Sequence, residues 1–142
     1  MEHAVIEEEL TIDTQQLTQH IVACLLDKKA RDISVLNVEG RTSYCDRLVL
    51  CTGTSSRQVR ALAEHVAQAM KSDHGRRPLG REGTEAGRWV LVDFGDVVVH
   101  IFDTQSRDHY DLDGLWVDAP RVTLSALGFS EEVPSAEMAP FV

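Results

Sequence analysis

Residues 89–102 constrain the fold of this chain more than any other segment. Their sequence, Trp-Val-Leu-Val-Asp-Phe-Gly-Asp-Val-Val-Val-His-Ile-Phe, predicts two antiparallel strands with Phe94 and Gly95 at the tip. Trp89 then lies opposite His100, and opposed residues share a face. One face carries only Val and Ile, and the other carries Trp89, Leu91, Val98 and His100. A strand pair buried on one face alternates apolar and polar residues, so this second face requires a cover: a helix of the same chain or another protein.

Length and charge narrow the class of protein. The chain has 142 residues, of which 43% are hydrophobic and 26% charged, which is typical of one globular domain. Its net charge of −9 argues against a protein that grips nucleic acid in a basic groove. An acidic surface favours solubility or a basic partner.

Three cysteines and the N-terminal residues indicate a reducing compartment. Cys24, Cys45 and Cys51 have no Cys-x-x-Cys spacing, and 7–9 are three glutamates where a signal peptide would be basic and then apolar. The apolar runs are much shorter than the ~20 residues that span a bilayer. We therefore expect a cytoplasmic protein without a membrane segment.

The periodicity predicts an α/β protein, with a mixed sheet flanked by helices. Asp13 or Thr14 can cap the first helix, and Ser55 with Gln58 forms a capping-box pattern before the second, which Gly75 ends. The predicted order is a helix at 14–30, strands at 32–38 and 47–52, the helix from Ser55 to Gly75, the strand pair at 89–102 and a short helix at 106–115. We expect a flexible acidic N-terminus (1–12), one domain (13–120) and a C-terminal tail (121–142).

One stretch suggests an enzyme. Gly53–Ser56 lies where a strand passes into a helix, a geometry that can hold phosphate, but it lacks the second Gly and the Lys of a P-loop. A nucleotidyltransferase would need paired carboxylates for Mg²⁺, and the next strand pair offers only Asp93 and Asp96 on either side of a turn. We favour a helix-capping turn over this alternative. His100 likewise has no second ligand at metal-binding spacing.

Aromatic residues gather in the C-terminal half. Trp89, Tyr110 and Trp116 lie among several aspartates, and aromatic anchors ringed by charge are typical of protein–protein contacts. The same pattern also fits a helix packed on the sheet by its aromatic residues. The sequence pattern favours neither interpretation.

Several blocks of this sequence resemble the ribosomal silencing factor family, also called the Iojap family. The resemblance covers residues 14–118. It rests on Asp32-Ile-Ser-Val-Leu-Asn-Val38, Cys51-Thr-Gly-Thr-Ser-Ser-Arg-Gln-Val59, Arg81-Glu-Gly83, Trp89–Phe102, Arg107-Asp-His-Tyr-Asp-Leu-Asp113 and Leu115-Trp116. It implies a single domain shaped like a nucleotidyltransferase but without the catalytic carboxylates, and therefore no enzyme, cofactor or metal.

The resemblance also implies a partner and a mode of action. Such a factor binds the large ribosomal subunit through ribosomal protein L-fourteen, blocks joining of the small subunit and represses translation under nutrient limitation. Relatives in organelles act in maturation of the large subunit. The resemblance implies no membrane partner and no sequence-specific contact with nucleic acid, and the apolar strand face would allow a homodimer away from the ribosome.

Carried onto this chain, the resemblance assigns the contact tryptophan to Trp89. We expect the contact surface to include Leu91, Val98 and His100 on the same face, Asp93 and Asp96 at a polar rim, and Arg107, Tyr110 and Trp116 as buttress or extension.

Overall fold

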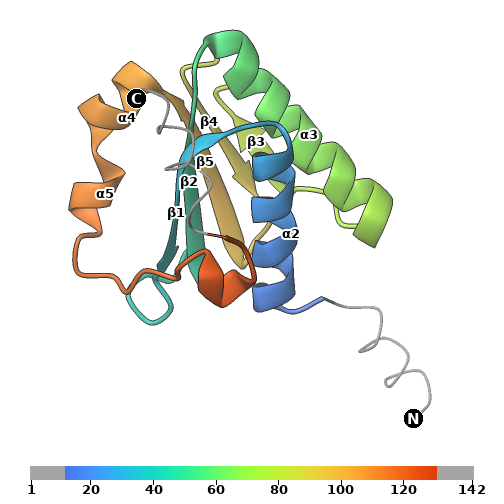
Figure 1. Ribbon diagram of the computed structural model, residues 1–142, viewed down its shortest axis with the longest axis vertical. Helices are drawn as coiled ribbons and strands as arrows, with labels where there is room; N and C mark the ends of the chain where they lie inside the picture. The colour runs from blue at the N-terminus through green and yellow to red at the C-terminus, as the bar shows by residue number, and fades with distance from the viewer. Residues whose placement is uncertain (1–11, 131–142) are drawn as a thin grey trace.

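The computed structural model describes residues 12–130, which form an α/β domain around a mixed five-stranded sheet (Figure 1). The strand order is β1-β2-β5-β4-β3, with β2 parallel to β5 and the other neighbours antiparallel. The predicted fold class is confirmed. The strands are β1 (Arg31–Asn37), β2 (Arg47–Gly53), β3 (Gly80–Glu82), β4 (Trp89–Asp93) and β5 (Val97–Asp103).

Two long helices, α2 (Thr14–Asp27) and α3 (Ser56–His74), cover one face of the sheet (Figure 1). Asp13 caps α2 in a capping box with Gln16, and the Ser55 side chain accepts a hydrogen bond from the Gln58 amide at the start of α3. The first helix ends before the predicted Ala30 because Lys29 adopts a left-handed conformation with φ of 64°.

The β4–β5 hairpin has the predicted faces but a different register. Trp89 lies opposite Phe102, and Leu91 lies opposite His100. The tip is Gly95-Asp96, since Gly95 has φ of +93° and its amide donates to the Asp93 carboxylate at 2.7 Å. The predicted tip at Phe94 and Gly95 was therefore wrong. The residue opposite each position differs from the predicted one by two positions along the strand, and this even shift leaves every side chain on its predicted face.

The two faces of the sheet pack into two separate cores. The first joins α2 and α3 to the valine face of the hairpin, including Val90, Val92, Val97, Val99 and Ile101. The second contains Leu36, Leu48, Leu50, Val98 and Phe102, with Trp89, Leu91, Leu112 and Trp116 packed against it and partly exposed. Two short helices, α4 (Thr104–Tyr110) and α5 (Leu112–Leu115), lie on this second side (Figure 1). The chain itself therefore supplies much of the cover that the second face requires.

Residues 121–130 pack against β1 and the first core. Arg121 forms a bridge with Leu36 of β1, and the Val122 amide donates to the Val35 carbonyl at 2.8 Å. Leu127, in the 3₁₀ helix η1 (Ser125–Leu127), is buried in the first core. The boundary at residue 120 stays a prediction, and the expected flexible N-terminus and the end of the tail fall outside the described residues, apart from Ile12. Among residues 12–130, no helix has the length and apolar character needed to span a membrane.

Candidate partner-binding surface

Trp89, at the start of β4, is the centre of an aromatic cluster on the second side of the sheet. Its ring stacks on Phe102 with centroids 5.1 Å apart and lies 4.6 Å from the ring of Tyr110 in α4. Tyr110 is 52% exposed, and Trp89 is half-buried. We define the aromatic face as the four partly exposed residues Trp89, Leu91, Tyr110 and Trp116. Rigid aromatic rings with one buried and one accessible side are well suited to anchor a protein partner.

His100 lies behind Trp89 and fixes its orientation. The indole N–H of Trp89 donates to Nδ1 of His100 at 3.0 Å, and His100 is only 8% exposed. This burial lowers the pKa of His100 to about 4, so the imidazole is neutral near pH 7 and can accept this bond. His100 therefore affects the aromatic face mainly by holding the indole ring.

The buried His100 predicts that the fold loses stability in mild acid. Between pH 6.5 and about 4 the unfolded chain protonates this imidazole while the folded chain does not, so the free energy of unfolding falls as the pH falls. The shift corresponds to roughly 3 kcal/mol across this range. Urea unfolding of wild type and His100→Asn at pH 7, 5.5 and 4 measures the difference. The prediction would be contradicted if the free energy of unfolding fell by the same amount between pH 7 and pH 4 in both proteins.

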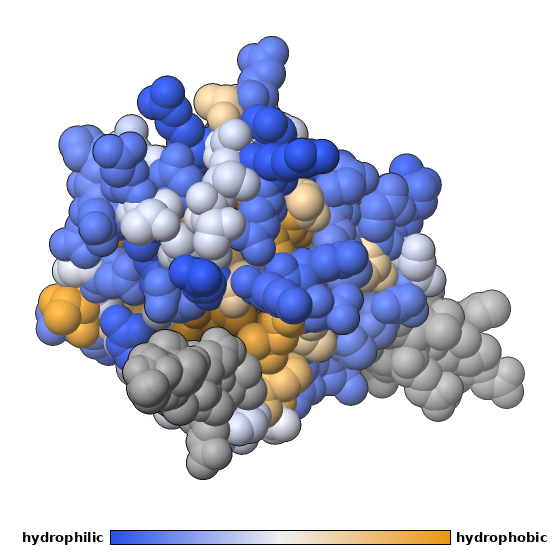
Figure 2. Space-filling view, turned by 45° about the horizontal axis from the view of Figure 1, so that its top comes forward, coloured by the Kyte–Doolittle hydropathy of each residue, from blue (hydrophilic) through white to orange (hydrophobic). Residues whose placement is uncertain are grey.

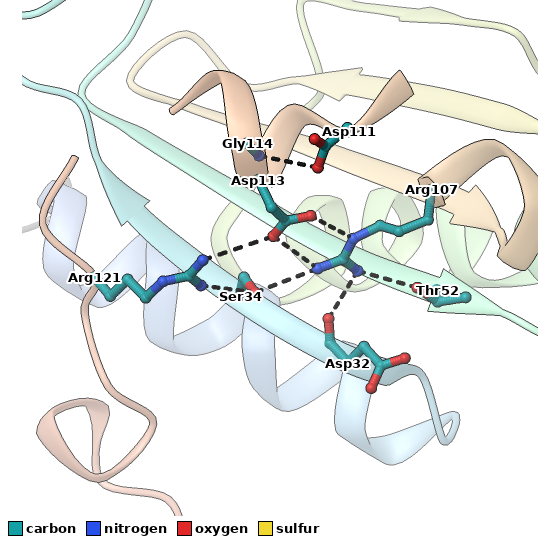
Figure 3. A network of polar contacts seen from close by, with 8 residues as sticks. All are labelled: Asp32, Ser34, Thr52, Arg107, Asp111, Asp113, Gly114 and Arg121. Carbon is teal, nitrogen blue, oxygen red and sulfur yellow. Dashed lines mark hydrogen bonds and ion pairs between the residues drawn. The ribbon is translucent and has the colours of Figure 1, made fainter. Parts of the chain in front are cut away.

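A second feature, a polar network around Arg107, ties α4 and α5 to the sheet (Figure 3). The guanidinium donates through Nε and Nη2 to both carboxylate oxygens of Asp113, at 2.9 and 3.2 Å. Nη1 donates to the Asp32 carbonyl at 2.8 Å and to the Thr52 hydroxyl at 3.0 Å, and Nη2 also reaches Ser34. These partners come from α5, the start of β1 and the end of β2, so one side chain joins three elements.

The network also has an electrostatic consequence for Asp113. The hydrogen bonds from Arg107 hold the pKa of the Asp113 carboxyl below its usual range, and Arg121 adds a longer ion-pair contact at 3.9 Å. Asp111, with φ of 47°, accepts from the Gly114 amide at 3.0 Å and shapes the bend between α4 and α5. This bend places Tyr110 and Trp116 on the same side of the sheet as Trp89.

The structure separates the remaining predicted site residues from this cluster. Asp93 and Asp96 lie at the hairpin tip, at the opposite end of β4 from Trp89. Asp93 accepts from the Gly95 amide, whereas Asp96 is exposed and its carboxylate lies 3.4 Å from the Thr14 hydroxyl. Val98 is buried in the second core.

Sequence reasoning did not assign four exposed apolar residues to the surface: Tyr44, Leu79, Leu115 and Val117. Leu115 and Val117 flank Trp116 in a segment that mixes aspartates with apolar residues. This mixture was the signal in the sequence that could have indicated exposed apolar side chains here. On the side shown in Figure 2 the surface is mainly hydrophilic, and hydrophobic residues gather in a band near the middle.

The turn at Gly53–Ser56 has little chemistry for a nucleotide. It borders a hollow of about 280 Å³ lined by Thr54, Ser55, Asp103, Thr104 and Gln105. The lining includes a carboxylate and no basic residue, and Ser55 and Asp103 each cap a helix. A carboxylate in this position disfavours a phosphate group. Within residues 12–130, no three His, Cys, Asp or Glu side chains are grouped to hold a metal ion.

The fold and the aromatic face define a small α/β protein with a surface suited to bind another protein. The chain matches the family described as "Ribosomal silencing factor during starvation" over residues 11–140. It therefore belongs to the ribosomal silencing factor family, which consists of non-enzymatic ribosome-binding factors. The resemblance found in the sequence is confirmed, and the family membership decides against the enzyme alternative.

Proteins from bacteria and from an animal are similar to this chain in sequence. The chain is 40% identical over 116 residues to a ribosomal silencing factor of Halalkalibacterium halodurans, covering 82% of this chain and 98% of that protein. Over 98 residues it is 34% identical to the mouse protein named "Mitochondrial assembly of ribosomal large subunit protein 1", covering 68% of this chain and 43% of that one. A crystal structure of a Chromobacterium violaceum protein, 42% identical, matches with a TM-score of 0.71 over 74% of this chain and 87% of that one.

Proposed function

We propose that this protein binds the large ribosomal subunit through ribosomal protein L-fourteen and blocks joining of the small subunit. Translation then falls because bound large subunits cannot form complete ribosomes. The observation that carries the proposal is the aromatic face, where the rings of Trp89 and Tyr110 lie in tilted contact and both keep accessible surface. A docked protein would bury this remaining apolar area and complete the cover of the second side of the sheet.

The acidic segment that carries Tyr110 and Trp116 of the aromatic face supports a basic partner. Residues 93–118 contain one basic side chain, Arg107, which the network around Asp113 occupies. The same segment contains seven aspartates: Asp93, Asp96, Asp103, Asp108, Asp111, Asp113 and Asp118. Ribosomal proteins are commonly basic because they bind RNA, and opposite charges accelerate encounter and orient docking. In this account Asp93 and Asp96, at the hairpin tip, supply polar contacts at the rim.

The residues of the surface take different roles in the proposal. Trp89 is the anchor, and Leu91, Tyr110 and Trp116 surround it with apolar contact area. His100 and Arg107 act from behind, the first by holding the indole and the second by holding α4 and α5. Val98 contributes from the core beneath.

Co-sedimentation in a sucrose gradient tests the proposed binding. The protein should migrate with purified large subunits and not with small subunits, and immobilised protein should retain isolated ribosomal protein L-fourteen. Migration with large subunits but no retention of ribosomal protein L-fourteen would contradict the proposed contact. Absence from the large-subunit fraction at micromolar protein would contradict the function as a whole.

A role in assembly of the large subunit is the second candidate, supported by the name of the mouse relative. Depletion of the protein in cells would then lead to accumulation of immature large subunits.

We further propose a cytoplasmic location. We also propose that, when ribosomes are absent, the protein forms a homodimer through the strand face that carries Trp89 and Leu91. Sedimentation equilibrium of the free protein, with the Trp89→Ala variant as control, measures the dimer.

A further inference from the structure

Charge is divided unevenly along this chain. Residues 56–88, which form α3, β3 and the loop between them, contain seven Lys and Arg and four Asp and Glu, for a net charge of +3. The full chain has 14 basic and 23 acidic residues, so the remainder carries seven basic against 19 acidic, or −12. An acidic protein therefore contains a region of net positive charge, and α3 lies on the opposite side of the molecule from α4 and α5 (Figure 1).

Part of this basic region forms a groove between α3 and β3. The groove has a volume of about 330 Å³, and its polar lining is Glu64, Gln68, Lys71, Arg77 and Arg81. We call it the basic groove. Arg81 pairs with Glu64 at 2.9 Å, which neutralises the one carboxylate. Within the described residues, Lys71 and Arg77 form no ion pair, so the groove keeps a net charge of about +2.

The backbone that carries Arg77 is held in place. Gly75 ends α3 in a left-handed conformation with φ of 64°, and the neighbouring Arg76 donates from Nη2 to the Phe94 carbonyl at 2.7 Å. The Leu79 amide donates to the Asp93 carbonyl at 2.7 Å on the other side of the loop. Because both flanks are fixed to the hairpin, a ligand that binds the groove pays little for ordering this loop.

We propose that the basic groove contacts the phosphate backbone of ribosomal RNA when the protein sits on the large subunit. This inference rests on the proposed binding of the large subunit and adds a second contact of different chemistry. Guanidinium and ammonium groups are the usual partners of RNA phosphates, and such contacts position a protein without reading sequence. Outside residues 56–88, the described part of the chain has 12 acidic and seven basic side chains, a net charge of −5 that RNA repels. The groove therefore favours approach to RNA from its own side of the protein.

The position of the basic groove allows both contacts at once. β3 is the last strand of the sheet and pairs with β4, which carries Trp89 and Leu91 on its other face. Arg81 lies opposite Val92, whose side chain faces the helices, and the groove therefore opens on the helix side of the same sheet edge. A ribosomal surface that wraps around this edge can place protein against Trp89 and Leu91 on one side and RNA against the groove on the other.

The salt dependence of binding tests this inference. Affinity for purified large subunits is measured from 50 to 300 mM KCl for wild type and for the double variant Lys71→Gln/Arg77→Gln. Each phosphate contact adds about 0.7 to 0.9 to the slope of log affinity against log salt, so two lost contacts should lower the slope by about 1.4 to 1.8. At 0.1 M salt this corresponds to a loss of roughly 25-fold or more.

Two controls separate this inference from the proposed function. Lys28→Gln/Lys29→Gln removes the same charge from exposed positions at the end of α2 and should bind as wild type does. The groove variant should keep its affinity for isolated ribosomal protein L-fourteen, whereas Trp89→Ala should lose it. Any of three results would overturn the inference. The salt slope of the groove variant could be unchanged, both double variants could lose the same affinity for large subunits, or the groove variant could lose its binding to isolated ribosomal protein L-fourteen. Unimpaired binding by Trp89→Ala would instead overturn the aromatic face as the contact surface, and absence of wild-type binding to large subunits would overturn the proposed function.

Discussion

Replacing Trp89 by alanine should weaken binding to the large ribosomal subunit by roughly 30- to 1000-fold, the effect of losing a central aromatic anchor worth about 2 to 4 kcal/mol. The indole contributes at three points: it stacks on Phe102, touches the exposed Tyr110 and donates to His100. Its loss therefore removes contact area and loosens the neighbouring side chains. Titration of labelled protein with large subunits, read by fluorescence anisotropy, gives the affinity.

The matched control for Trp89 is Leu79→Ala. Leu79 is an apolar residue that is 76% exposed and lies outside the aromatic face, so its truncation should leave the affinity for isolated ribosomal protein L-fourteen unchanged, whereas Trp89→Ala should lower it. Urea unfolding of both variants establishes that each is folded at the assay temperature. Equal affinities of Trp89→Ala and wild type would refute the assignment of the aromatic face as the contact surface.

The largest effect on stability is expected for Arg107→Ala. Its side chain is 12% exposed and forms hydrogen bonds with α5, β1 and β2, so its removal leaves Asp113 without its main partner and several polar groups unsatisfied. Loss of one member of a buried ion pair costs about 3 to 5 kcal/mol. Because Asp113 is 28% exposed and water can reach it, we expect the lower end, about 3 kcal/mol. The midpoint of urea unfolding measures this loss.

Arg121→Ala is the control for this variant. Arg121 is 55% exposed and its guanidinium lies 3.9 Å from Asp113, so its loss should change stability by less than about 0.5 kcal/mol. Similar unfolding midpoints for the two variants would show that the network does not depend on Arg107. A lower affinity of Arg107→Lys for the large subunit, at unchanged global stability, would further show that the network positions α4 and α5 for binding.

The hairpin shows how far sequence alone determines this fold. The alternation of side chains along a strand has a period of two, so the valine face and the aromatic face could be assigned without coordinates. The register could not, because it depends on which residues turn. Gly95 supplies the positive φ, but only the structure shows that Asp96, and not Phe94, joins it at the tip. Strand β3 was missed because three residues carry no detectable period.

The candidate site was predictable in composition but not in arrangement. The sequence singled out Trp89, Tyr110 and Trp116, and the contact of Tyr110 with Trp89 follows only from the bend of the chain between α4 and α5. The partners of Arg107 lie up to 75 positions away along the chain, a separation that no local pattern reports. Burial of His100 likewise depends on packing between elements that are distant in sequence.

The most direct test of the proposed function is the rate at which ribosomal subunits join. Light scattering after mixing purified large and small subunits follows the formation of complete ribosomes, with wild-type protein or Trp89→Ala bound beforehand at equal concentration. We predict that wild type reduces both the rate and the final amplitude, whereas Trp89→Ala leaves both close to the protein-free reaction. Normal joining by large subunits that demonstrably carry the wild-type protein would contradict the account.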